Sequence, residues 1–312
     1  MMTQAIIAVA AGVLLRDGRF LMASRPIDKI WGGYWEFPGG KVEPGESTRA
    51  ALIRELGEEL GIRVTRADPW IVREHQYPHG RVRLHFFRVT QWQGEPHPHE
   101  GQSLAWLSPD GDRPEPMLPP NAPVLRALSL PAVYGISQAE ALGTGAFLAR
   151  LDKALAAGLR LIQVRDKKLP EGERLELARQ VAVRAHAHGA RVLVNGSVDL
   201  CRAAGADGLH LDGTSLARLA ERPDVEWLGA SCHSREELDR AAALGADFAV
   251  LSPVLPTASH PGAATLGWER FAAWVQDCPI PVYALGGMHE NLLDEARGHG
   301  AHGIAMLRGA WT

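Results

Sequence analysis

Eight short apolar segments alternate with amphipathic helical segments over the second part of the chain, starting near Val133. In chain order they are VYGIS, LRLIQVR, ARVLVNG, GLHLDG, WLGASC, FAVLSPV, IPVYALGG and GIAMLRG. Four stretches, AAGLRLI, AAGADGLHL, ALGADFAVL and GHGAHGIAM, read as an internal repeat of a helix end, a glycine and a strand. Strands that are apolar throughout are typical of parallel sheets covered on both faces. Eight such units predict a (β/α)8 TIM barrel over residues 131–312.

This barrel is predicted to lack its last helix, because only GAWT follows the eighth strand. One edge of the barrel would then have no helical cover. We expect either the other domain or a second chain to fill that edge, so oligomerisation through it is one hypothesis.

Residues 1–130 show a different pattern, of strands broken by turns around one strong helix. AIIAVAAGVLL and RFLMASR flank Asp17-Gly18, a hairpin signal. A helix is predicted from about Ser47 to Leu60, with Ser47 or Thr48 as its cap and Gly61 ending it. RVRLHFFRVTQW alternates like a strand, SPDGDRPEPMLPPNAP is too rich in proline for regular structure, and APVLRALSL forms a short helix. Together with the 312-residue length, this predicts an α/β and α+β chain of two domains.

Composition excludes several classes of function. The chain has 33 basic and 36 acidic residues, and neither part has the basic excess that nucleic-acid polymers require. No apolar run is long enough to cross a bilayer, and the apolar N-terminus leads into a turn, so we expect a cytoplasmic protein. The cysteines Cys201, Cys232 and Cys278 form no CxxC pair, which indicates buried side chains rather than a zinc site or disulfides.

An acidic cluster follows a turn rich in glycine and proline, in the stretch GGKVEPGESTRAALIRELGEELGI. Glu55, Glu58 and Glu59 are spaced i, i+3 and i+4, so they project from one face of the predicted helix. Like charges at that spacing repel unless a cation neutralises them. Carboxylate oxygens favour Mg²⁺ or Mn²⁺, which commonly share coordination with substrate phosphates.

The same stretch resembles the Nudix box, Gly-x5-Glu-x7-Arg-Glu-U-x-Glu-Glu-x-Gly-U, where U is a bulky aliphatic residue. The matching positions are Gly40, Glu46, Arg54, Glu55, Leu56, Glu58, Glu59, Gly61 and Ile62. The resemblance implies an α/β/α sandwich that hydrolyses a diphosphate linked to another moiety, using divalent metals. It implies that Glu55, Glu58 and Glu59 hold or tune the metals, that Arg54 orients Glu55, and that Glu46 has a peripheral role.

The rest of the first domain is similar to the MutT branch, which removes 8-oxo-dGTP from the nucleotide pool and so serves DNA replication and repair. This likeness implies metal contacts from the Gly39 carbonyl and Glu100, with Glu55 or Glu100 as base for water attack at the β-phosphorus. It implies that Arg25, Phe37 and Asn121 contact the nucleotide. From residue chemistry alone, Asn121 is equally a turn residue between prolines. For Glu100 the alternative is a solvated loop acid, and its EGQ context favours the functional interpretation. The chain departs from the branch at His79 and Gly80 and in the bulkier WGGYWEF.

Polar residues stand where the barrel strands are predicted to end, which is where TIM barrels carry their chemistry. They are Gln163, Arg165, Asp166 and Lys167, Asn195, His210 and Asp212, Ser231 and His233, Ser252 and Thr257, Gly286 and Gly287, and Arg308 and Gly309. Paired glycines after the seventh strand suit a phosphate site built from backbone N–H groups.

Residues 133–309 resemble thiamine phosphate synthase and its relative, the thiazole tautomerase TenI, through QVRDK, VNGSVDL, ADGLHL, GASCHS, LSPVLPT and ALGGM. The likeness implies that Gln163, Arg165, Lys167, Asn195, Ser252, Thr257, Gly286 and Gly287 bind a thiazole phosphate or thiamine phosphate. Gly196 and Ser215 replace two metal-binding acids of the synthases, and His260 stands where they carry a lysine. His233 matches the proton-moving histidine of the tautomerase, and the alternative interpretation is a residue that caps the fifth barrel helix.

These features predict a Mg²⁺-dependent nucleoside triphosphate pyrophosphohydrolase, acting on 8-oxo-dGTP, fused to a tautomerase-like or degenerate barrel. Two alternatives stay open. The Nudix site could act on thiamine-related diphosphates beside a synthase, or the barrel could be a non-catalytic thiazole-phosphate binding module.

Overall fold

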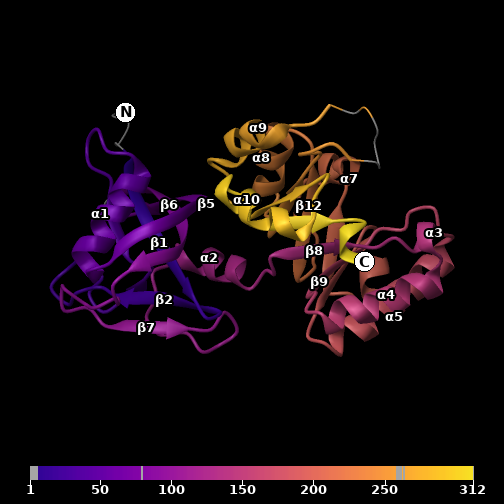
Figure 1. The fold of residues 1–312 in the computed structure, drawn as a ribbon, viewed down its shortest axis with the longest axis horizontal. Coiled ribbons are helices and arrows are strands. Elements are labelled where there is room, and N and C mark those ends of the chain that lie inside the picture. Colours follow the sequence, from indigo (N-terminus) through magenta and orange to yellow (C-terminus); the bar gives the residue numbers. More distant parts are fainter. Residues whose placement is uncertain (1–5, 79, 258–261, 263, 312) are drawn as a thin grey trace. The chain divides into compact units, whose positions relative to one another are not determined.

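The computed structural model describes residues 6–78, 80–257, 262 and 264–311, and divides into two compact units, Met1–Ser129 and Leu130–Thr312 (Figure 1). His79 and His260, two positions where the sequence departs from its relatives, lie outside the described residues.

The first unit is built on a mixed seven-stranded sheet. Its strands are β1 (Ile7–Arg16), β2 (Arg19–Ser24), β3 (Trp35–Glu36), β4 (Gly39–Lys41), β5 (Arg63–Tyr77), β6 (Gly80–Gln93) and β7 (Leu104–Leu107). They follow the order β3-β2-β1-β6-β5, with β4 paired to β1 and β7 to β2. β1 runs parallel to β6, with Ile7 opposite Val82, and antiparallel to its other partners. The predicted hairpin is confirmed, because Asp17 and Gly18 turn between β1 and β2 at φ 52° and 72°.

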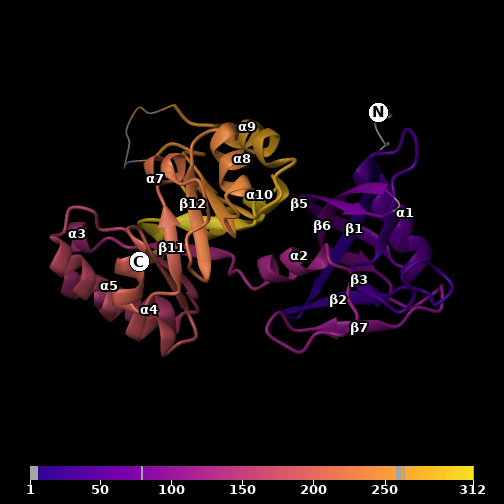
Figure 2. The same ribbon diagram turned by 180° about the vertical axis from the view of Figure 1, so that it is seen from behind.

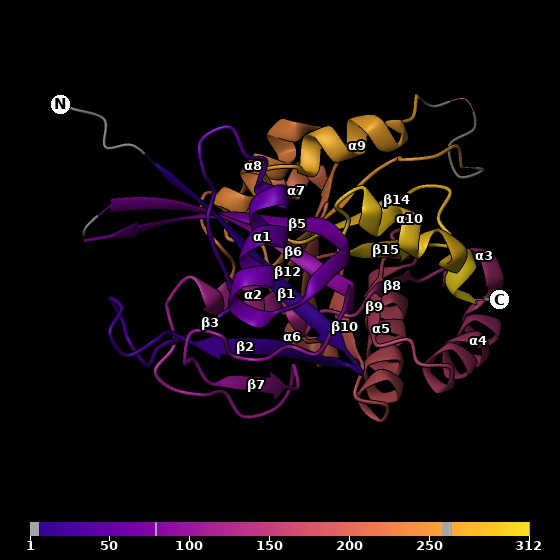
Figure 3. The ribbon, with the colours of Figure 1, turned by 60° about the vertical axis from the view of Figure 1, so that its left-hand side comes forward.

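Helix α1 (Thr48–Leu60) carries the acidic residues and packs on the sheet (Figure 3). The Ser47 side chain caps its first turn by accepting from the Ala50 N–H, and Gly61 ends it at φ 68°, as predicted. The helix approaches β1 closely at Gly12, where a Cβ would lie 2.9 Å from the Leu56 Cδ1. Helix α2 (Asn121–Leu128) is the predicted short helix, and it begins inside the proline-rich segment.

The second unit is a closed barrel of eight parallel strands, confirming the predicted TIM barrel in the part of the chain that the structure describes. The strands are β8 (Val133–Ile136), β9 (Leu161–Val164), β10 (Arg191–Val194), β11 (Gly208–Leu211), β12 (Trp227–Cys232), β13 (Phe248–Leu251), β14 (Val282–Leu285) and β15 (Gly303–Met306). Its interior is filled by aromatic and aliphatic side chains, among them Tyr134, Phe248 and Tyr283, which are buried.

Helices surround these strands (Figure 2). They are α3 (Ala139–Leu142), α4 (Thr144–Ala156), α5 (Glu171–His186), α6 (Val198–Ala204), α7 (Gly213–Arg218), α8 (Arg235–Ala243), α9 (Gly267–Val275), the 3-10 turn η1 (Glu290–Leu292) and α10 (Leu293–Gly298). The three cysteines are buried and unpaired, as the sequence indicated. Across the described residues, none of these helices has the length and apolar character needed to cross a membrane.

A tryptophan occupies part of the barrel edge at which no helix follows β15 in the described residues. After β15 the described part of the chain makes the 3-10 turn η2 (Gly309–Trp311), and Trp311 is 1% exposed. Its ring packs edge-on to Phe147 at 5.0 Å between centroids, and its Nε1 donates to the Ile136 carbonyl at 2.7 Å. A Cβ on Gly135 would come within 3.1 Å of the indole, so that glycine makes room for it. The chain therefore supplies some of the cover expected from another domain or chain, and oligomerisation through this edge stays a prediction.

Candidate active site

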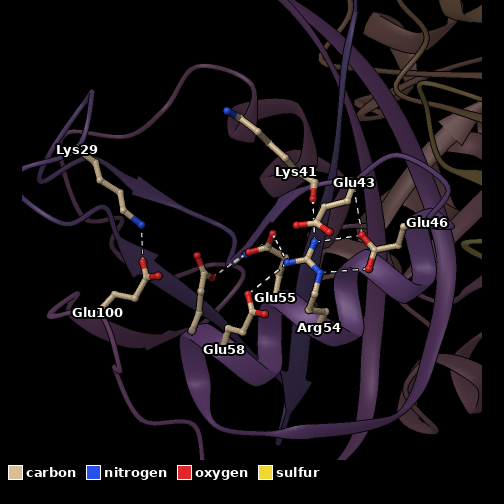
Figure 4. A network of polar contacts seen from close by, with 10 residues as sticks. Lys29, Lys41, Glu43, Glu46, Arg54, Glu55, Glu58 and Glu100 are labelled. Carbon is tan, nitrogen blue, oxygen red and sulfur yellow. Dashed lines mark hydrogen bonds and ion pairs between the residues drawn. The ribbon is translucent and has the colours of Figure 1, made fainter.

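Arg54 lies at the centre of the acidic cluster on α1 (Figure 4). Its Nη1 donates to Glu55 Oε1 at 2.9 Å and to Glu58 Oε2 at 3.2 Å. Its Nε and Nη2 donate to the two oxygens of Glu46, at 3.2 and 3.1 Å, and Nη2 also reaches the Lys41 carbonyl. These bonds raise the pKa of Arg54. One guanidinium thus holds three of the four predicted acids of this stretch.

Glu46 approaches this guanidinium from the loop before the helix. The Glu43 N–H donates to its Oε2 at 3.2 Å, and the hydrogen bond from Arg54 lowers its pKa. Glu46 is therefore fixed as an anion whose contacts orient Arg54. That geometry agrees with a peripheral role.

Two glycines bring the backbone of β4 against the acidic side chains. A Cβ on Gly40 would lie 2.2 Å from the Glu55 carboxyl carbon, so any other residue there would force that carboxyl group to move. Gly39 has φ 141°, and its N–H donates to Glu59 Oε2 at 3.0 Å. These close approaches give a physical reason for glycine at both positions.

Among the acids of this cluster, Glu59 is the one whose negative charge is least favourable in the metal-free protein. Burial, followed by the nearby carboxylates of Glu36, Glu100 and Glu55, raises its pKa to about 8. A half-buried carboxylate among other carboxylates is unfavourable as an anion, and a divalent metal would neutralise that charge. The hard oxygen donors of this cluster suit Mg²⁺ or Mn²⁺. Within the described residues, however, no three acidic, histidine or cysteine side chains form a ready ligand group, and Gly39, Glu55, Glu58, Glu59 and Glu100 remain a predicted set.

Glu100 is held near the helix by two contacts. Lys29 Nζ lies 2.5 Å from Glu100 Oε2, which raises the pKa of Lys29. Gln102, which is buried, accepts the Glu100 N–H at 2.7 Å through Oε1 and donates to the Glu59 carbonyl at 3.0 Å. Sequence reasoning missed Gln102 as a positioning residue, although the EGQ triplet was the available signal.

The predicted nucleotide contacts lie around strand β3. Arg25 donates through Nη1 to Glu36 at 2.6 Å and through Nε to the Ile30 carbonyl at 2.8 Å. Asn121 is buried, and its Nδ2 donates to the Trp35 carbonyl at 3.3 Å. Phe37 is 3% exposed and packs between Phe20 and Phe86, each 5.9 Å away. Contact of Arg25, Phe37 and Asn121 with a base stays a prediction.

Glu36 was not identified from the sequence. Burial raises its pKa, while Arg25 opposes that shift. The sequence feature that could have pointed to Glu36 was its place in WEFPGG, three residues before Gly39. A half-buried acid paired with Arg25 connects the predicted nucleotide contacts to the acidic cluster.

At the mouth of the barrel, Lys167 is already paired. Its Nζ lies 2.6 Å from Asp212 Oδ2, and this bond lowers the pKa of Asp212 to about 2. Asn195 Nδ2 donates to the His210 carbonyl at 2.9 Å. Gln163 is 2% exposed, and its buried Nε2 has no partner in the described structure. Arg165 and Thr257 are also placed at this end, after β9 and β13.

His233 does not cap a helix. Ser234 caps α8, accepting from the Glu237 N–H at 3.2 Å, so the interpretation of His233 as the capping residue is wrong. The His233 Nδ1 instead lies 2.9 Å from the Ser252 carbonyl.

Gly286 and Gly287 have φ 101° and 68°, and a Cβ on Gly287 would come within 2.8 Å of Leu255, so the turn after β14 needs glycine.

Comparisons with known proteins match the two units separately. The family described as "NUDIX domain" matches residues 10–127, and the family described as "Thiamine monophosphate synthase" matches residues 133–310. The chain is 42% identical over 123 residues to a CTP pyrophosphohydrolase of Escherichia coli, which is 39% of this chain and 90% of that protein. It is 42% identical over 96 residues to an 8-oxo-dGTP diphosphatase of Proteus vulgaris, covering 30% of this chain and 86% of that protein.

The barrel has its own relatives. It is 38% identical over 180 residues to a Geobacter sulfurreducens protein provisionally named a thiamine-phosphate synthase, covering 56% of this chain and 84% of that protein. Among solved structures, a thiamine phosphate pyrophosphorylase from Pyrococcus furiosus matches at 28% identity and a TM-score of 0.48, covering 56% of this chain and 84% of its own. The ORF135 protein of E. coli matches at 39% identity and a TM-score of 0.35, covering 40% and 89%.

Proposed function

The chain belongs to the Nudix family over residues 10–127 and to the thiamine monophosphate synthase family over residues 133–310, and from this we propose a specific reaction for the first domain. It hydrolyses 8-oxo-dGTP to 8-oxo-dGMP and pyrophosphate, with Mg²⁺ as the resident metal. The observation that carries this proposal is the geometry of the acidic cluster, in which Arg54 binds Glu55 and Glu58 and the Gly39 N–H donates to Glu59 at 3.0 Å. The likeness to the 8-oxo-dGTP diphosphatase of Proteus vulgaris supports the choice of nucleotide.

The metal would be held by Glu55, Glu58, Glu59, Glu100 and the Gly39 carbonyl. When bound, Mg²⁺ neutralises the phosphate charges and lowers the pKa of water. The chain's own residues position the groups around it. Arg54 keeps Glu55 and Glu58 on one side, while Gln102 and Lys29 hold Glu100. Attack of water at the β-phosphorus would break its bond to the oxygen shared with the α-phosphorus. The nucleoside monophosphate leaves with that oxygen, the β- and γ-phosphates leave as pyrophosphate, and Glu55 or Glu100 accepts the water proton.

A second candidate substrate is a pyrimidine nucleoside triphosphate. It is favoured by the E. coli relative, whose name gives CTP as its substrate and of which this chain covers 90%. Fusion to the barrel suggests a third candidate, thiamine diphosphate.

A substrate comparison on the full chain tests these candidates. We expect kcat/KM with Mg²⁺ to be highest for 8-oxo-dGTP among 8-oxo-dGTP, dGTP, CTP and thiamine diphosphate. Excess chelator, or replacement of both Glu58 and Glu59 by Gln, should remove the activity. A clear preference for CTP or thiamine diphosphate would contradict the proposed substrate. Turnover that survives in chelator would contradict the metal-dependent mechanism itself.

For the barrel, we propose binding of a thiamine-related phosphate ester, with tautomerase-like proton transfer at His233. Synthase activity is less favoured, because Gly196 and Ser215 replace acids, and Asp212 neutralises Lys167. A Cβ on Gly196 would also meet Leu200 at 2.7 Å.

Replacing His233 by Asn separates a tautomerase from a binding module. The variant should lose any thiazole tautomerase rate while still binding thiamine monophosphate, measured by calorimetry. If wild-type protein binds this ligand without any turnover, the barrel is a binding module. An unchanged rate in the variant would exclude His233 from the mechanism.

A further inference from the structure

Three polar side chains form a hydrogen-bonded chain through the barrel interior. The Tyr134 hydroxyl on β8 lies 3.1 Å from His210 Nδ1 on β11. The His210 Nε2 lies 2.9 Å from Ser231 Oγ on β12. Tyr134 and His210 are 0% and 1% exposed, whereas Ser231 is only half-buried. The function proposed above uses none of the three.

The donor count fixes which ring nitrogen of His210 carries hydrogen. Among the described residues, His210 Nδ1 is the one hydrogen-bond partner of the Tyr134 hydroxyl. If Nδ1 carried a hydrogen, the buried tyrosine hydroxyl would have no acceptor for its own, at a cost of roughly 1–3 kcal/mol. Tyr134 therefore donates to Nδ1, and the ring hydrogen resides on Nε2.

A second ring proton is excluded on electrostatic grounds. Burial, assisted by the positive charge of Arg165, lowers the pKa of His210 to about 3. The ring is therefore neutral near pH 7, with a single N–H to donate. That N–H points to Ser231.

Donation from His210 Nε2 makes Ser231 Oγ an acceptor and leaves the serine hydrogen unused by the described protein groups. Ser231 stands near the carboxyl end of β12, on the face where barrels of this kind bind ligands. Gln163, near the carboxyl end of β9, adds a buried Nε2 that also lacks an acceptor. Two donors on this face, the Ser231 hydroxyl and the Gln163 Nε2, therefore have no acceptor among the described protein groups, and a ligand could supply one.

We propose that Tyr134 and His210 are positioning residues, which commit the Ser231 hydroxyl to donate to an acceptor atom of the barrel's ligand. That atom is an unprotonated ring nitrogen or a phosphate oxygen. The inference rests on the proposed binding of a thiamine-related phosphate ester.

The tautomer is tested first, on the full chain without ligand. ¹⁵N NMR of histidine-labelled protein, with His210 assigned by its loss in H210Q, should show a neutral ring protonated at Nε2. In Tyr134→Phe the constraint is removed, so the Nδ1–H form should become populated. A His210 ring protonated at Nδ1 in the wild-type chain would overturn the proposal whatever the barrel binds.

Binding is tested by calorimetry with thiamine monophosphate, thiamine and inorganic phosphate. Ser231→Ala should weaken thiamine monophosphate binding about tenfold, which corresponds to one hydrogen bond of about 1.4 kcal/mol. If Ser231→Ala also weakens the binding of inorganic phosphate, the acceptor is a phosphate oxygen. If it also weakens the binding of thiamine, the acceptor is a ring nitrogen. No loss with any of them would overturn the proposal.

A double-mutant cycle separates positioning from packing. Tyr134→Phe should weaken binding several-fold in the wild-type chain and have no further effect in the Ser231→Ala variant, since it acts through that hydroxyl. Tyr283→Phe is the matched control, because its hydroxyl bonds to the Pro131 carbonyl and not to His210. Equal losses from Tyr134→Phe in both backgrounds would show that Tyr134 only packs. If wild-type protein binds none of the probes, the proposed barrel function fails, while the NMR result still decides the tautomer.

Discussion

At the residue scale, Gly40 shows how a backbone position can control an acidic site. Its missing side chain leaves the space that the Glu55 carboxyl group occupies. We expect Gly40→Ala to displace Glu55 and lower kcat about 100-fold, because small misplacements of catalytic groups cost that much. Steady-state hydrolysis with Mg²⁺ measures the effect.

Gly57→Ala is the matched control for this prediction. Gly57 lies inside α1, and the nearest atom to an added Cβ is the Ile62 carbonyl oxygen at 3.7 Å. Alanine there should preserve activity and stabilise the helix by about 1 kcal/mol. Equal activity in both alanine variants would show that the close approach at Gly40 does not matter.

Glu59 predicts a pH dependence of stability in the metal-free protein. Its pKa is about 8 when folded and near 4.5 when unfolded, so between these values the folded state binds more protons. Stability should therefore fall as pH rises from about 4.5 to 8, at up to about 1.4 kcal/mol per pH unit. Glu59→Gln should remove this decline and Mg²⁺ should oppose it, as thermal unfolding in chelator and in Mg²⁺ would show. A metal-free protein equally stable at pH 5 and pH 8 would contradict the assignment.

At the scale of elements, the short turn η2 takes over a role usually given to a helix. Trp311→Ala should destabilise the barrel by about 3–5 kcal/mol, because it empties a buried ring site and removes the bond to Ile136. Chemical denaturation followed by circular dichroism measures this loss. Val183→Ala, at a side chain that is 71% exposed, should change stability very little. If Trp311→Ala were equally mild, the indole would not be closing the barrel edge.

Most elements could be predicted from sequence because local signals and burial agree in them. The eight barrel strands are mostly apolar and almost entirely buried, and α1 has both a serine cap and a terminal glycine. The role of Trp311 could not be predicted, since it depends on Gly135 and Phe147, far away in sequence. Gln102 could not be predicted for the same reason, because it contacts Glu59, 43 residues away. Glu36 lies only 11 residues from Arg25, but their contact depends on the pairing of β2 with β3, which no local spacing encodes.

At the scale of the whole molecule, the boundary between the units has a physical definition. The Leu130 carbonyl accepts from His302 Nε2 at 3.0 Å, and the Pro131 carbonyl accepts from the Tyr283 hydroxyl at 2.5 Å. Leu130 is 4% exposed and belongs to the apolar cluster inside the barrel. These two residues therefore belong to the barrel, and Ser129 is the last residue of the first unit.

This boundary predicts how the chain can be divided. A fragment of residues 130–312 should fold with the stability of the barrel in the full chain, whereas a fragment of residues 132–312 should be less stable by at least about 2–4 kcal/mol. The shorter fragment loses a buried leucine and leaves the His302 and Tyr283 side chains without these acceptors. Denaturant unfolding of the two fragments, which differ by only Leu130 and Pro131, measures the difference. Equal stabilities would mean that the barrel closes without these residues and that the boundary lies later in the chain.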